Sequence, residues 1–131
     1  MVKARCAALA LLIVSTPATA RADDDPWIAG DKAAHFGVSA GIGAGSYALG
    51  AAIFDARGHA LIFAGAVTLT AGGVKELADL AGAGVPSWKD FAWDAIGAVT
   101  GLAIAWSVDL LVRGVSDEHP LFRLPRPVVS F

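Results

Sequence analysis

The sequence predicts an all-α protein, a small bundle of three apolar, membrane-spanning helices that follows an N-terminal signal peptide. Hydrophobic residues make up 56% of the chain and the mean hydropathy is +0.60, while charged residues make up 17%. Soluble domains average about 25% charged residues. Three apolar stretches of about 20 residues each match the thickness of a hydrocarbon core, and no strand-like alternation competes with them. The alternative is a soluble or surface-attached helical bundle in the periplasm.

Residues 1–22 have the layout of a secretory signal peptide. Lys3 and Arg5 form a basic start, an apolar run covers 7–14, and small residues follow it. Cleavage after Ala20 or after Ala22 fits this layout. The apolar run is short for a membrane span, so an uncleaved anchor is the less favoured alternative.

The single cysteine, Cys6, precedes the apolar run of the signal, whereas a lipoprotein cysteine follows it. A cleaved chain therefore has no thiol, and neither a disulfide nor a lipid anchor is expected. The sequence thus predicts an exported protein of the inner membrane or the periplasm.

A three-helix domain is expected at 31–113, between a polar segment at 23–30 and an irregular tail at 114–131. Its helices are predicted at about 33–54, 60–79 and 87–112. Polar residues at 55–59 separate the first two helices, and Gly82, Gly84 and Pro86 mark a turn before the third. Ser87 can cap the third helix, with Asp90 three residues further on.

Small residues recur at every fourth position in two of the predicted helices. Gly37, Gly41 and Gly45 repeat in the first helix, and Gly97 and Gly101 in the third. This spacing lets membrane helices approach closely, so we expect both sets at helix contacts.

Nine ionisable residues are predicted to lie at one end of the bundle. Asp31 and His35 share a face of the first helix, and Ser39 continues that face one turn deeper. Cleavage of the signal would leave the N-terminus outside, which places this end at the periplasmic face. The nine residues are Asp31, Lys32, His35, Lys75, Glu76, Asp79, Lys89, Asp90 and Asp94.

This mixture of one imidazole and several carboxylates suits general acid–base work or a divalent metal. The candidate catalytic residues are His35, as base or ligand, and Glu76, Asp90 and Asp94, as orienting groups or metal ligands. A structural polar cluster of Asp31, Lys32, Lys75 and Asp79 would surround them. A mutually paired clasp without catalysis is the competing interpretation, and a proton or ion path is a third. The sequence identifies no cofactor.

The opposite end is predicted to be cytoplasmic. Arg57, Arg113, Arg123 and Arg126 lie there against three lysines at the outer end, a slight positive-inside bias. Asp109 is expected to pair with Arg113 four residues later. His59 and His119 are interpreted as solvated loop residues.

The polar order resembles a known pattern. Asp31-Lys32-x-x-His35-Phe36, Lys75-Glu76-x-x-Asp79 and Ser87-x-x-Asp90-x-x-x-Asp94-x-x-Gly97 together resemble the YfiM-like family of periplasmic lipoproteins. They are more distantly similar to the VanZ-like membrane family. The resemblance implies an exported, helical, envelope-associated protein and supplies no reaction. The lipoprotein cysteine and the Gln and Arg of the VanZ-like middle motif are absent from this chain.

These observations predict an envelope protein with a structural or accessory role. The alternative is a small membrane enzyme that acts on a lipid or cell-wall precursor at the periplasmic face. Expected partners are membrane lipids, with a second copy of the chain or another envelope protein as further candidates. A net charge of -2 gives no indication of nucleic-acid binding.

Overall fold

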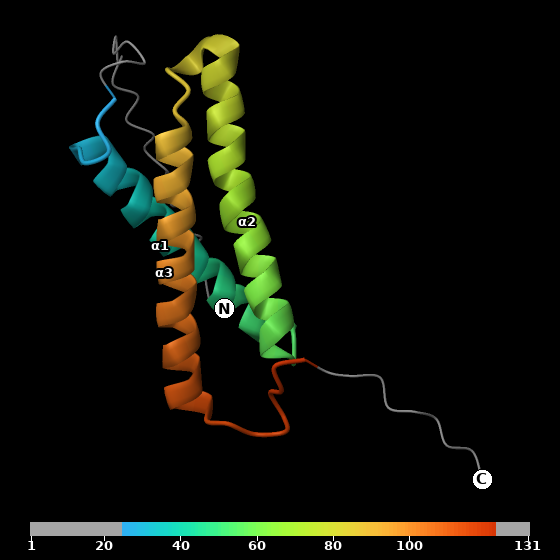
Figure 1. Ribbon diagram of the computed structural model, residues 1–131. Helices are drawn as coiled ribbons and strands as arrows, with labels where there is room; N and C mark the ends of the chain where they lie inside the picture. Colours follow the sequence, from blue (N-terminus) through green and yellow to red (C-terminus); the bar gives the residue numbers. More distant parts are fainter. Residues whose placement is uncertain (1–24, 123–131) are drawn as a thin grey trace, which may run out of the picture.

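The computed structural model describes residues 25–122, and this part of the chain is all-helical (Figure 1). The signal peptide expected at 1–22 and the end of the tail at 123–131 lie outside the described residues. The predicted fold class is confirmed by three long helices and one short π-helical turn. They are α1 Gly30–Ile53, α2 Arg57–Ala78, η2 Asp79–Ala83 and α3 Trp88–Arg113.

The connection between α1 and α2 is shorter than the predicted polar break at 55–59. Residues 57–59 belong to the first turn of α2. The end of the described chain folds back and supplies the missing acceptors for this turn. The Arg57 N–H donates to the Pro120 carbonyl at 2.8 Å, and the Gly58 N–H to the Leu121 carbonyl at 2.6 Å. A helix start needs such partners for its free N–H groups, and here they come from a distant segment that local sequence cannot reveal.

The second connection is a tight reversal after η2. Gly82 has a φ of 101°, a left-handed backbone that glycine adopts at little cost. Ser87 then caps α3 as predicted, since its Oγ accepts a hydrogen bond from the Asp90 N–H at 3.3 Å. The chain thereby enters α3 with Asp90 in the first helical turn.

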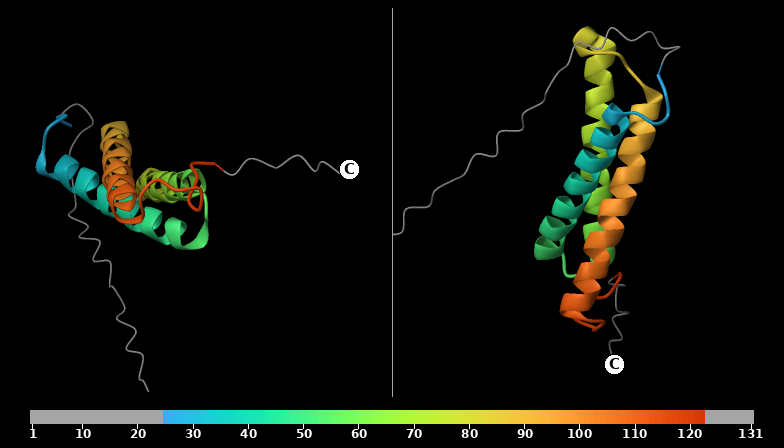
Figure 2. Two further views of the ribbon diagram at one scale, coloured as in Figure 1. Left: turned by 90° about the horizontal axis from the view of Figure 1, so that it is seen from below. Right: turned by 90° about the vertical axis from the view of Figure 1, so that its left-hand side faces the viewer.

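Two helices run side by side and the third crosses them. Figures 1 and 2 show α2 and α3 aligned along their length, with α1 passing obliquely across both. The segment after α3 returns to the start of α2, so this end of the bundle is closed by contacts between distant parts of the chain.

Apart from Tyr47, the buried hydrophobic residues are alanines, and large apolar residues cover the outside. The buried hydrophobic centre consists of Tyr47 with Ala60 and Ala64. By contrast, Val99 is 68% exposed and Leu111 86% exposed. Soluble bundles bury their large side chains and expose polar ones, so this distribution suits a protein surrounded by lipid.

All three long helices have the length and composition needed to cross a membrane. Only 22%, 22% and 17% of the residues in their most apolar windows are buried inside the bundle. The remaining apolar surface faces outward, where water would be an unfavourable neighbour. These features support association with a membrane.

The expectation for the glycines is half correct. Gly97 and Gly101 face the backbone of Phe36 and Ala40, so α1 and α3 approach there without intervening side chains. A side chain at either position would overlap a backbone carbonyl of α1. This part of the prediction is confirmed.

The prediction for Gly37, Gly41 and Gly45 is wrong, because nothing lies near the position of a Cβ at any of them. The contact face of α1 instead carries Ser39, Gly43, Tyr47 and Gly50. A Cβ at Gly50 would lie 3.0 Å from the Ala60 Cα. The three predicted glycines occupy a different face of the same helix, and spacing alone does not say which face meets a partner.

Candidate functional site

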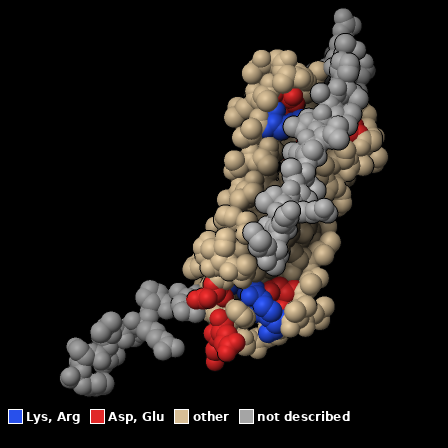
Figure 3. Space-filling view, turned by 180° about the vertical axis from the view of Figure 1, so that it is seen from behind, with Lys and Arg blue, Asp and Glu red and all other residues tan. Residues whose placement is uncertain are grey.

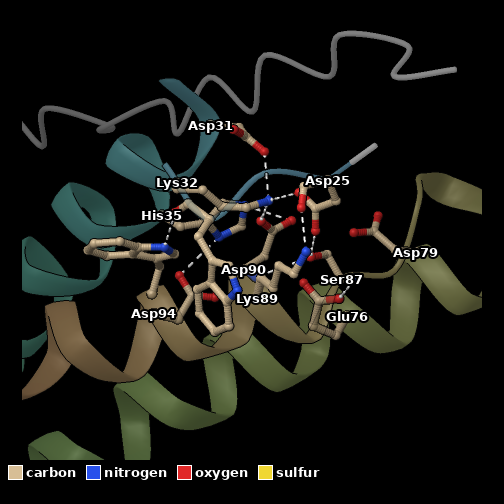
Figure 4. Close-up of polar contacts among 12 residues, drawn as sticks. Asp25, Asp31, Lys32, His35, Glu76, Asp79, Ser87, Lys89, Asp90 and Asp94 are labelled. Atoms are coloured by element: carbon tan, nitrogen blue, oxygen red, sulfur yellow. Dashed lines mark hydrogen bonds and ion pairs between the residues drawn. The ribbon is translucent and has the colours of Figure 1, made fainter. Parts of the chain in front are cut away.

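Charged side chains gather at the two ends of the visible face of the bundle, with other residues between them (Figure 3). At one end, α1 and α3 begin and α2 finishes, so all nine ionisable residues predicted there lie at that end. Asp25 and Ser87 join them in one connected set, which we call the end network (Figure 4). Its members are Asp25, Asp31, Lys32, His35, Lys75, Glu76, Asp79, Ser87, Lys89, Asp90 and Asp94.

Lys32 lies at the centre of the end network and is 1% exposed. Its Nζ donates to Asp25 Oδ1 at 2.5 Å, to Asp31 Oδ2 at 2.9 Å and to Asp90 Oδ1 at 2.5 Å. An ammonium group has three protons to donate, and here each meets a carboxylate. A buried cation is tolerated only with such partners, so Lys32 ties the start of α3 to the start of α1.

Sequence reasoning missed Asp25, which was assigned to the polar segment before the first helix. Its Oδ2 accepts from the Ser87 Oγ at 2.6 Å, and its backbone carbonyl accepts from the Lys89 Nζ. The hydrogen bond from Lys32 is the main cause that holds the pKa of Asp25 below its ordinary value of 3.8. A run of aspartates before a helix usually indicates a solvated segment, so local pattern gave no signal for this role.

His35 is held between two carboxylates of α3. Its Nδ1 lies 3.0 Å from Asp94 Oδ1, and its Nε2 lies 3.5 Å from Asp90 Oδ2. The Ser39 hydroxyl donates to the same Asp94 oxygen at 2.7 Å. The His35 side chain is 18% exposed, compared with 6% for Asp94. The predicted face of α1 that carries His35 and Ser39 therefore meets Asp94 directly.

Lys75 connects α2 to the same network. Its Nζ lies 2.9 Å from Glu76 Oε1, 2.8 Å from Asp79 Oδ2 and 3.3 Å from Asp90 Oδ2. Lys75 and Asp79, two members of the expected structural polar cluster, thus form an ion pair four residues apart on α2. Asp90 is the common partner of Lys32, Lys75 and His35. One carboxylate of α3 therefore joins all three long helices.

The four candidate catalytic residues are only partly brought together. His35, Asp90 and Asp94 are in direct contact, whereas Glu76 reaches them through Lys75. The other oxygen of Glu76 accepts from the Ser87 N–H at 2.8 Å. Glu76 therefore closes the connection between α2 and α3 and does not face His35.

Three carboxylates of the end network have the spacing of a metal site. One oxygen from each of Asp25, Asp31 and Asp90 lies within 4.8 Å of the others. The Lys32 ammonium, however, binds all three carboxylates. A cation at this point would compete with a positive charge that the chain itself supplies.

A groove of about 480 Å³ lies beside the end network, between the end of α2 and the start of α3. Leu77, Leu80 and Phe91 make its walls apolar, and Glu76 and Ser87 are its polar members. His35, Asp90 and Asp94 do not line it. The groove therefore gives no access to the imidazole.

A second polar cluster lies at the opposite end of the bundle, and we call it the Arg57 cluster. The predicted pair of Asp109 with Arg113 is present, but Asp109 also accepts from Arg57 Nε at 2.5 Å and from the Tyr47 hydroxyl at 3.1 Å. Arg57 is 4% exposed. Its two remaining nitrogens each donate at 2.6 Å, to the carbonyls of His119 and Gly114. Sequence reasoning treated Arg57 only as a charge at the membrane surface.

Each of the two histidines expected to be solvated loop residues fits that interpretation in part. His59 is exposed but belongs to the first turn of α2, with its ring 6.1 Å from Phe54 and 6.2 Å from Phe122. His119 does lie in the loop after α3. It is only partly exposed, because the loop packs back onto α2.

Comparisons with known proteins leave the geometry as the main guide to function. No protein-family model matches this chain, and neither the curated proteins nor the solved structures give a match.

Proposed function

We propose that this protein is an exported, inner-membrane protein of the cell envelope, and that its end network is a structural clasp at the periplasmic face. Its role is structural or accessory and needs no chemistry at the cluster. The observation that carries this proposal is the pairing of Lys32, a cation that is 1% exposed and has a carboxylate for each of its three donors.

The geometry of His35 also favours a clasp. A general base needs a free nitrogen within reach of a substrate proton. Asp94 engages Nδ1 of His35, and Nε2 faces Asp90. Both ring nitrogens therefore point at carboxylates of the same chain, an arrangement that stabilises an imidazolium and ties α1 to α3.

Tryptophans support a membrane boundary at the level of the end network. The rings of Trp27 and Trp88 meet edge to face at 4.7 Å, and the Trp93 indole donates to the Trp27 carbonyl at 2.8 Å. Indoles favour the interface between lipid and water. The expected signal peptide and the slight excess of arginine at the other end support a periplasmic orientation of the network.

Single-cysteine labelling tests this orientation. In a Cys6→Ser background, Ala83→Cys places a thiol beyond the end network, and Ser116→Cys places one in the loop after α3. Both positions are exposed. A membrane-impermeant maleimide should label Ala83→Cys in intact spheroplasts and Ser116→Cys only after lysis. The reverse pattern contradicts the proposed orientation, and labelling of both positions in intact spheroplasts contradicts the three spans.

The second candidate is a small membrane enzyme acting on a lipid or cell-wall precursor at the same face. The observation that favours it is the contact of His35 with Asp94, since a carboxylate that orients an imidazole is common in catalysis. The 18% exposure of the His35 side chain leaves an edge of the ring accessible. The resemblance to the YfiM-like and VanZ-like families fits either candidate.

Stability separates the two candidates. A clasp predicts that His35→Ala and Asp94→Ala both lower the thermal unfolding midpoint in detergent. Ser107→Ala on the exposed face of α3 is the control, because its hydroxyl only donates to the Ala103 carbonyl of its own helix. Wild-type stability in both variants, together with loss of the function in complemented deletion cells, would favour the enzyme and exclude the clasp.

A further inference from the structure

The connection between α2 and α3 carries almost no charge on its outside. We call residues 77–88 the hairpin tip; they comprise the end of α2, all of η2 and the turn into α3. Asp79 is the only ionisable residue in this range, and its carboxylate binds Lys75 of α2 at 2.8 Å. The Ser87 hydroxyl also turns inward, where it donates to Asp25. The outside of the hairpin tip is therefore apolar.

Exposed apolar side chains continue from the side of the bundle onto the hairpin tip. Those of Val74, Leu77, Leu80 and Trp88 are each more than half exposed. Three of them, Leu77, Leu80 and Trp88, also line the groove beside the end network. The outward apolar surface of α2 is thus continuous with the surface of the hairpin tip and its groove.

The loop after α3, at the opposite end of the bundle, has the composition of a connection that meets water. Ser116, Asp117 and Glu118 follow one another there, and all three are exposed. Connections between helices in water usually carry such polar residues. The hairpin tip has no outward charge to match them, so its surroundings should differ from those of this loop.

The length of the second helical segment places the hairpin tip near the edge of a bilayer. Arg57–Ala83 forms a span of 27 residues, which is roughly 40 Å long at about 1.5 Å per residue. The hydrocarbon core of a bilayer is about 30 Å thick, and the bilayer is about 40–45 Å thick with its headgroup layers. With Arg57 at one surface, the end of η2 therefore reaches the headgroup layer of the other.

We infer that the hairpin tip docks into the headgroup layer of a phospholipid bilayer, with the side chains of Leu77, Leu80 and Trp88 directed toward the acyl chains. Phospholipid, and not a second protein, then covers the groove. An indole suits this position, because tryptophan favours the interface between lipid and water. The headgroup layer is hydrated, so a thiol at Ala83 stays open to a water-soluble maleimide. The inference rests on the proposed membrane insertion of the three long helices and not on their orientation.

Spin labels measure the depth of the hairpin tip in the full chain. Leu80→Cys and Val99→Cys each replace a side chain that is 68% exposed, and Ser116→Cys lies in the loop after α3. Each variant is made in the Cys6→Ser background, labelled with a nitroxide and reconstituted in phosphatidylethanolamine–phosphatidylglycerol vesicles. The measurement compares collisions of the nitroxide with oxygen, which concentrates among acyl chains, and with a water-soluble nickel chelate present on both sides of the membrane.

The label of Leu80→Cys should collide with the nickel chelate several-fold less often than that of Ser116→Cys, and more often with oxygen. The label of Val99→Cys, near the middle of α3, should be the most shielded from nickel. Because Leu80 and Val99 have the same exposed fraction, the bundle itself shields the two labels alike and their difference reports depth. Unfolding midpoints close to that of Cys6→Ser establish that the labelled chains are folded.

Nickel collisions at Leu80→Cys as frequent as those at Ser116→Cys would place the hairpin tip in water and overturn the inference. Rare collisions with both oxygen and nickel would also overturn it, because protein, such as a second copy of the chain, would then cover the tip. A failure of the proposed membrane insertion is recognised separately. In that case the label of Val99→Cys would be open to the nickel chelate, and both the spans and the docking of the tip would be excluded.

Discussion

At the scale of single residues, Lys32 decides how the end network is held together. Three carboxylates surround its ammonium group, and two of them, Asp25 and Asp90, belong to segments 65 residues apart in numbering. Removing one member of a buried ionic group leaves its partners without a counter-charge, which is far more costly than losing an exposed pair.

Lys32→Met should therefore destabilise the protein by about 3–5 kcal/mol. The measurement is thermal or denaturant unfolding in detergent micelles. Lys89→Met is the matched control, because Lys89 donates to a backbone carbonyl and lies 5.8 Å from the Trp27 ring centroid. Its expected cost is about 1 kcal/mol. Equal stability of the two variants would contradict the central position of Lys32.

Asp25 should make the clasp sensitive to acid. Its folded pKa is below the ordinary value of 3.8, with the hydrogen bond from Lys32 as the largest cause. A carboxyl group whose pKa is lowered in the folded protein stabilises the fold at pH values above its unfolded pKa. This stabilisation is lost as the pH falls from the unfolded pKa through the folded pKa. Asp25→Asn should thus lower the unfolding midpoint at pH 6. Near pH 3, the midpoints of the variant and of the wild-type protein should lie closer together. A difference that does not change with pH would contradict this coupling.

At the scale of helices, glycine determines which faces meet. Gly97 on α3 faces the Phe36 carbonyl, whereas Gly37 on α1 faces open space. Replacement by alanine should therefore lower the stability at Gly97 but not at Gly37, although both glycines belong to the four-residue repeats of the sequence.

Gly97→Ala should separate α1 from α3 and cost about 1–3 kcal/mol. Gly37→Ala should be neutral or stabilising by up to about 1 kcal/mol, because alanine favours the helix. Unfolding midpoints of the two variants in the same detergent check this. A greater loss for Gly37→Ala would show that the exposed glycine face has a partner.

The helices themselves were predictable, whereas the choice of contact faces was not. Long apolar stretches, the Ser87 cap and the glycine–proline turn at 82–86 are local signals, and the structure follows them. Asp25 and Arg57 depend on partners more than 50 residues away, namely Asp25 on Ser87 and Arg57 on Asp109. Local periodicity cannot identify such partners, so the sequence located the end network but missed Asp25 and most of the Arg57 cluster.

At the scale of the whole molecule, the outward apolar surface distinguishes a membrane bundle from a soluble one. Val99 lies near the middle of α3 and is 68% exposed, and Val112 lies near its end and is 78% exposed. In water, a lysine at either position would be harmless. In a bilayer, the central position is the unfavourable one.

Val99→Lys should impair membrane insertion, because a lysine at the centre of a span costs about 3 kcal/mol. Val112→Lys should insert normally, since a lysine near a helix end can extend its ammonium group to the interface. Fractionation with alkaline carbonate compares the two. Equal membrane recovery of both variants would favour the soluble or surface-attached bundle.

The return of the chain to the start of α2 also affects the timing of folding during synthesis. The N-cap Ala56 provides no side-chain hydrogen bond, and the Arg57 and Gly58 N–H groups bind carbonyls of Pro120 and Leu121. These acceptors are made more than 60 residues after the groups they serve. These two N–H groups of the first turn of α2 therefore lack their acceptors until the ribosome has finished α3 and the loop beyond it. This end of the bundle can therefore close only after the loop has been made, and a nascent chain that stops short of Pro120 lacks both hydrogen bonds.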